Sequence, residues 1–111
     1  MPHRASPLYV AKADFFRTLG HPARVRILEL LRDGERSVGS LQAELGLDSG
    51  GTSQQLAALR RIGLVESRKV GTSVFYRVSD NEVFGLLELA RAILGRGAES
   101  QRTLLEELAA E

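Results

Sequence analysis

The residues best suited to chemistry in this 111-residue chain are polar or basic, and they lie between positions 48 and 78. Ser53, Gln54 and Gln55 stand side by side, and their hydroxyl and amide groups can both donate and accept hydrogen bonds. Residues 52–78 carry five Lys or Arg against one Glu, a net charge of +4, whereas the whole chain has a net charge of +1. Hydrogen-bonding side chains beside clustered positive charge are typical of a nucleic-acid-binding surface. The cations that could bind phosphates are Arg60, Arg61, Arg68 and Lys69.

Two short helices are predicted to position these side chains. Ser37 can cap the first helix at its N-terminus, and Gly46 can end it. Asp48 can cap a second helix, which Gly63 ends in the same way. Together the two helices predict a helix-turn-helix over about residues 38–62.

A β-hairpin is predicted directly after the second helix, over about residues 64–78. Side chains alternate in character along Val74-Phe75-Tyr76-Arg77-Val78, as in a strand with two different faces, and Gly71-Thr72 can form the turn. A helix-turn-helix followed by such a wing is a DNA-binding module. The predicted fold is therefore mainly α with a small β-hairpin, a winged helix-turn-helix. An ordinary solvated hairpin is the alternative for the wing.

Early residues of a recognition helix reach base edges in the major groove, where Gln can pair with adenine and Ser can bind a base or a phosphate. Gly51 in the first turn would allow close approach of the backbone to DNA, unless that turn is merely frayed. Thr52 also begins the i, i+4, i+7 stripe that should face the core with Leu56 and Leu59. The predicted DNA-binding residues are Ser49, Gly51, Thr52, Ser53, Gln54, Gln55, Arg60, Arg61, Arg68, Lys69 and Thr72.

Surplus apolar surface on the flanking helices predicts a dimer. A helix over about residues 8–19 carries Phe15 and Phe16 side by side and so has apolar surface in two directions, although both could lie in one core. The helix after the wing has two apolar stripes, and a small protein buries such a surplus most simply against a second subunit. The predicted dimer-interface residues are Leu8, Phe15, Phe16, Leu86, Leu87, Ile93 and Leu94.

The chain is predicted to hold one winged-helix domain over residues 8–97, preceded by a flexible arm over residues 1–7 with two prolines. Gly95-Arg96-Gly97 is predicted to separate a final amphipathic helix over residues 98–111. That helix would support the dimer or pack back on its own subunit.

Composition excludes several classes of function. Without cysteine the chain has no disulfide, thiolate ligand or thiol redox switch. His3 and His21 do not complete a catalytic set, and no Gly-rich phosphate loop is present, so neither an enzyme nor a cofactor is predicted. No apolar run approaches the ~20 residues of a membrane span, and no apolar signal core begins the chain, so a cytoplasmic protein without membrane contact is expected.

Several sequence blocks occur in a characteristic order. They are Leu19-Gly20-His21-Pro22-Ala23-Arg24-Val25-Arg26-Ile27-Leu28, Ser37-Val38-Gly39-Ser40-Leu41, Ser53-Gln54-Gln55-Leu56 with Leu59-Arg60-Arg61-Ile62-Gly63-Leu64-Val65, and Gly71 with Tyr76-Arg77-Val78. Through these blocks, about residues 16–91 resemble the ArsR/SmtB family of bacterial winged-helix repressors. The resemblance implies a homodimer joined by its N- and C-terminal helices. It also implies recognition helices in successive major grooves of an inverted repeat in double-stranded DNA, and repression that an effector relieves.

The chain departs from the resemblance where a metal effector would bind. Metal sensors of the family use cysteines on the first motif helix, or Asp and His residues on the C-terminal helix. Residues 37–45 contain no cysteine and residues 80–97 contain no histidine. Asp80, Glu82 and Glu88 therefore lack the imidazole partners that Zn or Ni normally recruits, and no metal site is predicted. A small organic effector, a partner protein, or control by the protein's own abundance stays open.

Two alternative functions follow from the same residues. A winged helix can serve protein–protein contacts without binding DNA, although the +4 segment and the polar Ser/Gln face argue against it. A metal-responsive repressor that uses only carboxylates is the other alternative. Gln55 stands where many members of the family have histidine, which keeps hydrogen-bonding ability but can shift the preferred DNA sequence.

Overall fold

The computed structural model describes residues 7–110, so most of the predicted N-terminal arm, with His3, lies outside the described residues. The chain divides into two compact units, Met1–Asp80 and Asn81–Glu111. The described part of the first unit holds the helices and strands of the winged helix, and the second unit holds one long helix.

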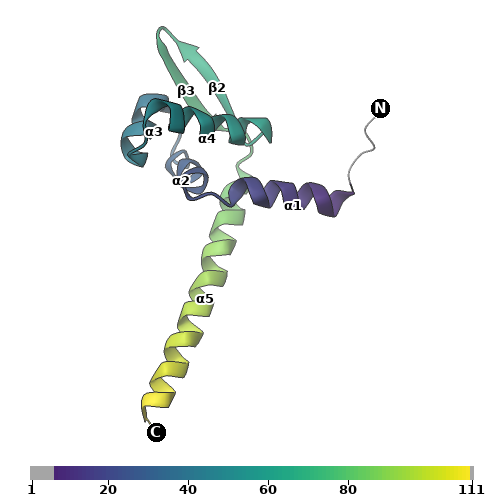
Figure 1. Ribbon diagram of the computed structural model, residues 1–111, viewed down its shortest axis with the longest axis vertical. Coiled ribbons are helices and arrows are strands. Elements are labelled where there is room, and N and C mark those ends of the chain that lie inside the picture. Colours follow the sequence, from purple (N-terminus) through teal and green to yellow (C-terminus); the bar gives the residue numbers. More distant parts are fainter. Residues whose placement is uncertain (1–6, 111) are drawn as a thin grey trace. The chain divides into compact units, whose positions relative to one another are not determined.

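The predicted helix-turn-helix is confirmed within the first unit. Ser37 caps its first helix by accepting a hydrogen bond from the Ser40 N–H at 3.1 Å. Asp48 caps its second helix by accepting from the Gly51 N–H at 2.6 Å. Gly46, with φ +65°, ends the first helix in the left-handed conformation that favours glycine. Figure 1 shows the helices of this unit: α1 Leu8–Leu19, α2 Pro22–Leu30, α3 Val38–Leu45 and α4 Ser49–Arg61.

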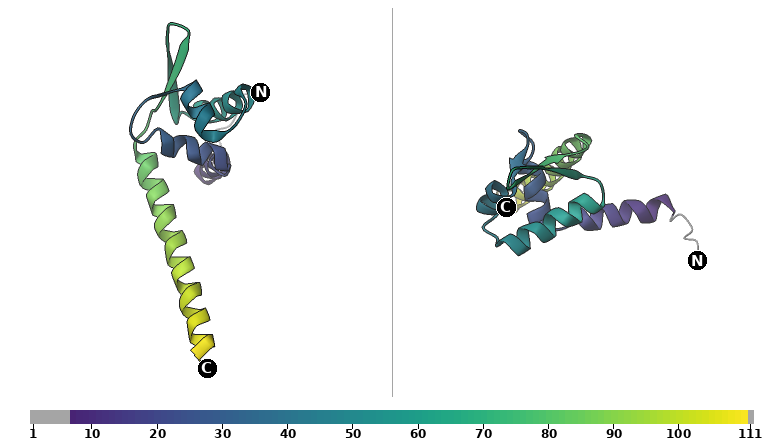
Figure 2. Two further views of the ribbon diagram at one scale, coloured as in Figure 1. Left: turned by 90° about the vertical axis from the view of Figure 1, so that its left-hand side faces the viewer. Right: turned by 90° about the horizontal axis from the view of Figure 1, so that it is seen from above.

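The predicted hairpin is also confirmed, and a short third strand joins it. β2 Val65–Val70 pairs antiparallel with β3 Ser73–Val78 across a turn at Gly71, whose φ is +61°. β1 Arg36–Ser37 pairs antiparallel with the other edge of β3, so the sheet order is β1-β3-β2. Two residues are too few to show an alternating pattern, and the sequence therefore did not predict β1. Figure 2 shows that the hairpin projects away from the helices of its unit.

The hydrophobic core lies where α2, α3 and α4 pack together. Leucines and an isoleucine from all three helices are completely buried: Ile27, Leu28, Leu41, Leu56 and Leu59. Leu56 and Leu59 occupy the stripe of α4 that the helical periodicity predicts. Each such side chain contributes about 1.5–3 kcal/mol by leaving water. The burial of one face of α4 therefore fixes which of its residues are exposed.

The structure of the second unit shows that the helix break predicted at residues 95–97 is wrong. Helix α5 runs without interruption over Glu82–Ala110, through Gly95 and Gly97, instead of restarting at residue 98. Neither glycine has a positive φ, so neither ends the helix as Gly46 ends α3. Each costs only ~1 kcal/mol relative to alanine, and good helix formers surround both of them. No helix in the described part of the chain is long and apolar enough to cross a membrane.

The first turn of α4 should respond differently to alanine at its two glycines. Gly50→Ala should raise the free energy of unfolding by up to ~1 kcal/mol, because alanine favours the helix and the nearest atom to its Cβ would lie 3.8 Å away. Gly51→Ala should gain less or lose stability, because its Cβ would lie 3.0 Å from the capping oxygen Asp48 Oδ1. Urea unfolding followed by circular dichroism, at one protein concentration, measures both; equal gains would contradict this account of the cap.

Candidate nucleic-acid interface

One face of α4 is exposed and largely polar, and it carries five of the eight DNA-binding residues predicted on this helix. The residues on it fall within one side of the helix because each position turns by about 100°. Ala57, at the middle of this face, was missed by sequence reasoning, although it lies four residues after Ser53 and three after Gln54. Its methyl group could contact a thymine methyl. The exposed residues of α4 are Ser49, Gly50, Ser53, Gln54, Ala57, Arg60 and Arg61.

Two residues predicted to bind DNA have local structural roles instead. Thr52 is completely buried, and its hydroxyl donates to the Asp48 carbonyl at 3.0 Å, so its assignment to the DNA-binding set is wrong. Its helical position already placed it on the core stripe. Gly51 is half-buried and donates its N–H to the Asp48 carboxylate, and the absence of a side chain there leaves room for that cap.

Gln55, unlike the neighbouring Ser53 and Gln54, is hydrogen-bonded to another helix. Its Oε1 accepts from Nε of Arg24 in α2 at 2.8 Å, and the side chain is half-buried. Nη1 of Arg24 also donates to the carbonyl of Thr18 in α1 at 3.1 Å. Arg24 therefore bridges α1, α2 and α4. Gln55 does not lie on the exposed face with Ser53 and Gln54, which corrects the expectation that all three read bases together.

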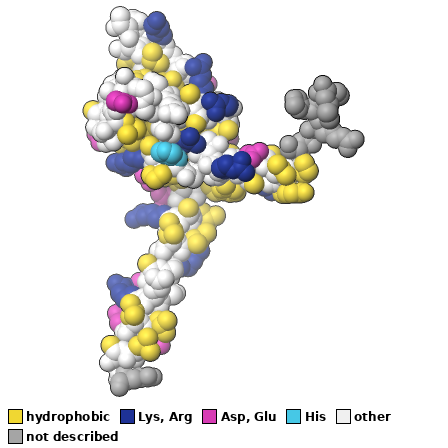
Figure 3. All heavy atoms as spheres, viewed as in Figure 1, with side chains coloured by type: hydrophobic (Ala, Val, Ile, Leu, Met, Phe, Trp, Pro, Cys, Tyr) yellow, Lys and Arg dark blue, Asp and Glu magenta, His cyan; other side chains and the backbone are white. Residues whose placement is uncertain are grey.

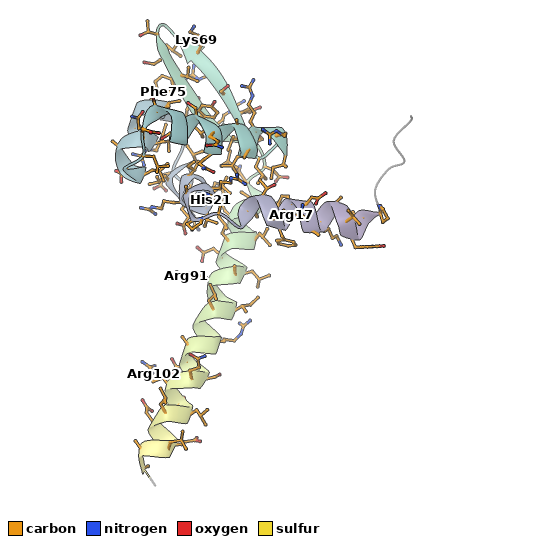
Figure 4. All side chains as sticks on the ribbon, in the orientation of Figure 1. Arg17, His21, Lys69, Phe75, Arg91 and Arg102 are labelled. Atoms are coloured by element: carbon orange, nitrogen blue, oxygen red, sulfur yellow. The ribbon has the colours of Figure 1, made fainter. Side chains whose placement is uncertain are left out.

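The predicted wing contacts lie on different faces of the hairpin. Arg68 and Lys69 are consecutive in β2, and consecutive strand residues point to opposite faces. Arg68 lies opposite Phe75 in the register of β3, whereas Lys69 lies opposite Val74. Lys69 and Thr72 are exposed, and Figure 4 shows Lys69 close to the tip of the hairpin. The tip therefore offers a lysine and a hydroxyl to a phosphate.

Arg68 is held by a carboxylate. Its Nε and Nη2 donate to the two carboxylate oxygens of Glu35 at 2.7 and 2.6 Å, and its Cζ lies 5.8 Å from the centroid of the Phe75 ring. These hydrogen bonds lower the pKa of Glu35 below its ordinary value and raise the pKa of Arg68. A second ion pair, 2.5 Å between Arg77 Nη2 and Glu66 Oε1, lies on the same face.

Two of the five basic residues in the +4 segment are therefore paired with carboxylates. Among the described residues, no ion pair involves the other three: Arg60, Arg61 and Lys69. The positive charge that is free to meet phosphate lies at the C-terminal end of α4 and at the tip of the wing. Sequence charge alone did not reveal this distribution, because the pairing of Arg68 with Glu35 joins residues 33 positions apart.

The described residues do not gather the ligands of a metal site. No group of three or more His, Cys, Asp or Glu side chains able to hold a metal ion occurs within residues 7–110. His21 caps α2 instead: its Nδ1 accepts a hydrogen bond from the Ala23 N–H at 3.1 Å.

Apolar side chains are exposed along α1 and along α5. Of the predicted dimer-interface residues, four are exposed (Leu8, Phe16, Ile93 and Leu94), and three are half-buried (Phe15, Leu86 and Leu87). Figure 3 shows hydrophobic side chains on both helices. Extended exposed apolar surface of this kind marks an interaction site. Sequence reasoning missed further exposed members: Tyr9, Leu89, Leu104, Leu105 and Leu108.

Known proteins share both the sequence and this geometry. Residues 21–67 match the arsR family of bacterial regulatory proteins. Over 107 residues the chain is 46% identical to the uncharacterised HTH-type transcriptional regulator Rv0081 of Mycobacterium tuberculosis, covering 96% of this chain and 94% of that protein. The chain belongs to the arsR family. The crystal structure of Rv0081 matches this arsR-family protein with a TM-score of 0.80, over 87% of this chain and 98% of that one.

Two further relatives of this arsR-family protein bear on its function. The chain is 40% identical over 81 residues to a biofilm growth-associated repressor of Agrobacterium fabrum, covering 73% of this chain and 69% of that protein. The solution structure of the homodimeric winged helix-turn-helix DNA-binding domain of Mb0332 from Mycobacterium bovis matches with a TM-score of 0.74 at 30% identity, over 90% of this chain and 95% of that one. The predicted family, fold and role as a DNA-binding transcriptional regulator are thus confirmed.

Gln55 and Gln54 should differ in their effect on stability. Gln55→Ala leaves Arg24 Nε without its acceptor in a half-buried site and should lower the free energy of unfolding by about 1–3 kcal/mol. Gln54→Ala, one position along the same helix and exposed, should change it by no more than about 0.5 kcal/mol. Urea unfolding of both variants tests the difference. If Gln55→Ala proved as mild as Gln54→Ala, the bond to Arg24 would not support α4.

Proposed function

We propose that this protein is a homodimeric repressor that binds an inverted repeat in double-stranded DNA and thereby occludes a promoter. The observation that carries this proposal is the exposed polar face of α4, with Arg60 and Arg61 at its C-terminal end, neither in an ion pair within residues 7–110. Such a face can enter a major groove, which is wide enough to admit a helix. The similarity to a named repressor supports repression as the mode of action.

Base and phosphate contacts divide between the exposed residues. Gln54 and Ser53 read base edges, since a Gln amide can bond bidentately to adenine and a hydroxyl to either a base or a phosphate. Ser49 lies in the first turn of α4, where free N–H groups and the helix dipole favour a phosphate. Arg60 and Arg61 bind the flanking backbone, and the wing adds Lys69 and Thr72.

The dimer joins the exposed apolar surfaces of α1 and α5 from two copies. The homodimeric relative supports this arrangement. A two-fold symmetric protein reads two half-sites related by the same symmetry, and their centres lie about one helical turn of DNA, roughly 34–36 Å, apart. This geometry is the reason for expecting an inverted repeat. Binding to the chromosome implies action in the cytoplasm.

An effector, if the repressor uses one, is proposed to be a small organic molecule or a partner protein rather than a transition metal. The described carboxylates do not gather into a metal site, and neither an imidazole nor a thiolate accompanies them on α5. Catalysis is not part of the proposal, because the relatives are regulators of transcription.

Fluorescence anisotropy on DNA from upstream of the protein's own gene, against a random duplex, tests the proposal. Tight, salt-dependent binding that prefers the upstream DNA and does not change between EDTA and Zn²⁺ is expected, with a dimer in sedimentation. A reporter driven by that DNA should be silenced. Activation of the reporter would overturn repression, release by zinc would favour the carboxylate metal sensor, and no binding to either duplex would favour a protein–protein winged helix.

Substitutions on α4 should separate base reading from phosphate binding. Gln54→Ala should relax preference at one base position by about 1–3 kcal/mol. Arg61→Ala should weaken binding to all sequences and reduce the slope of log K against log salt by about one unit. Arg102→Ala, which removes an exposed arginine from α5, is the matched control and should leave the slope unchanged. Equal loss on specific and random DNA in Gln54→Ala would remove Gln54 from base recognition.

A further inference from the structure

The ion pair between Glu35 and Arg68 has the geometry of a phosphate contact. Two parallel N–H···O bonds, of 2.7 and 2.6 Å, join the guanidinium to both carboxylate oxygens. A guanidinium binds a DNA phosphate through the same two-pronged arrangement. Glu35 lies just before β1 and Arg68 lies in β2, so the sheet brings the two together.

The arginine of this pair is the partner that faces solvent. The Arg68 side chain is 63% exposed, whereas the Glu35 side chain is only 25% exposed. Phe75, which is opposite Arg68 on β3, supports the guanidinium with its ring at 5.8 Å. The guanidinium therefore lies at the surface, where a phosphate can compete with the Glu35 carboxylate for it.

The pair also removes the net charge of this hairpin face. Glu66 and Arg77 lie opposite one another on the same face and form the second ion pair. Two carboxylates and two guanidinium groups, all exposed or half-buried, then give a neutral surface where the sequence suggested phosphate binding. Arg68 differs from Lys69, which has no ion pair among the described residues.

We propose that Glu35 occupies the position of a DNA phosphate on Arg68 in the free protein and so lowers the affinity of the wing for DNA. This inference rests on the proposed function, since it requires that the wing meets DNA. A phosphate must displace the carboxylate before Arg68 contributes to binding. Phosphates carry no base information, so Glu35 lowers affinity for every sequence alike.

Glu35→Gln tests the inference because it removes the charge and keeps the shape. Binding should tighten by about three- to tenfold near 0.1 M salt on both the upstream and the random duplex, and the slope of log K against log salt should steepen by about 0.9. Asp33→Asn is the matched control: it removes the same charge two residues away, from an exposed side chain that has no ion pair among the described residues. It should change affinity by less than about twofold.

The Arg68→Gln background completes the test. When Glu35→Gln is combined with Arg68→Gln, it should no longer tighten binding, because the guanidinium that Glu35→Gln would free is absent. Tightening that persists without Arg68, or that Asp33→Asn reproduces, would overturn the inference in favour of general charge. Weaker binding by Glu35→Gln, with an unchanged unfolding midpoint, would mean that the pair positions the wing for DNA. If the wild type binds but Glu35→Gln matches it, the inference alone fails; if the wild type binds neither duplex, the proposed function fails with it.

Discussion

Leu56 and Leu59 of α4 are completely buried, and the orientation of the recognition helix depends on that burial. Both pack where α2 and α3 supply Ile27, Leu28 and Leu41. A helix has little freedom to rotate once one stripe leaves water, because each buried leucine contributes about 1.5–3 kcal/mol. The opposite stripe is then exposed by geometry alone. The same packing therefore stabilises the fold and presents the polar face to DNA.

Electrostatic function in this protein depends on which charges are paired rather than on how many there are. The segment from 52 to 78 has a net charge of +4, yet two of its arginines are engaged by carboxylates. Exposed ion pairs contribute little to stability. They matter here because an arginine already bound to a carboxylate has to exchange partners before it can bind phosphate. The cations on α4 and at the wing tip, which form no ion pair in the described part of the chain, need no such exchange.

Polar side chains of α4 have two different roles: some are exposed and can contact DNA bases, and others hold the helices together. Ser53 and Gln54 are exposed, whereas Gln55 is tied to Arg24, which also reaches the end of α1. One guanidinium, that of Arg24 in α2, therefore hydrogen-bonds to both α1 and α4. Since α1 carries exposed apolar residues suited to a second subunit, the same arginine connects the proposed dimer surface with the proposed DNA surface.

The sequence by itself determined the helices, the caps at Ser37 and Asp48 and the hairpin, because caps, turns and periodicities act over a few neighbouring residues. It also assigned to the DNA-binding set the polar and basic residues exposed on α4, but it added Thr52 and Gln55 and missed Ala57. Only the tertiary structure decided that the side chains of Gln55 and Arg68 are engaged by other residues of the chain. Their partners are 31 and 33 positions away, and no local pattern encodes contacts made across helices or strands. The continuity of α5 through Gly95 and Gly97 was likewise undecided locally, because a glycine that weakens a helix does not by itself end it.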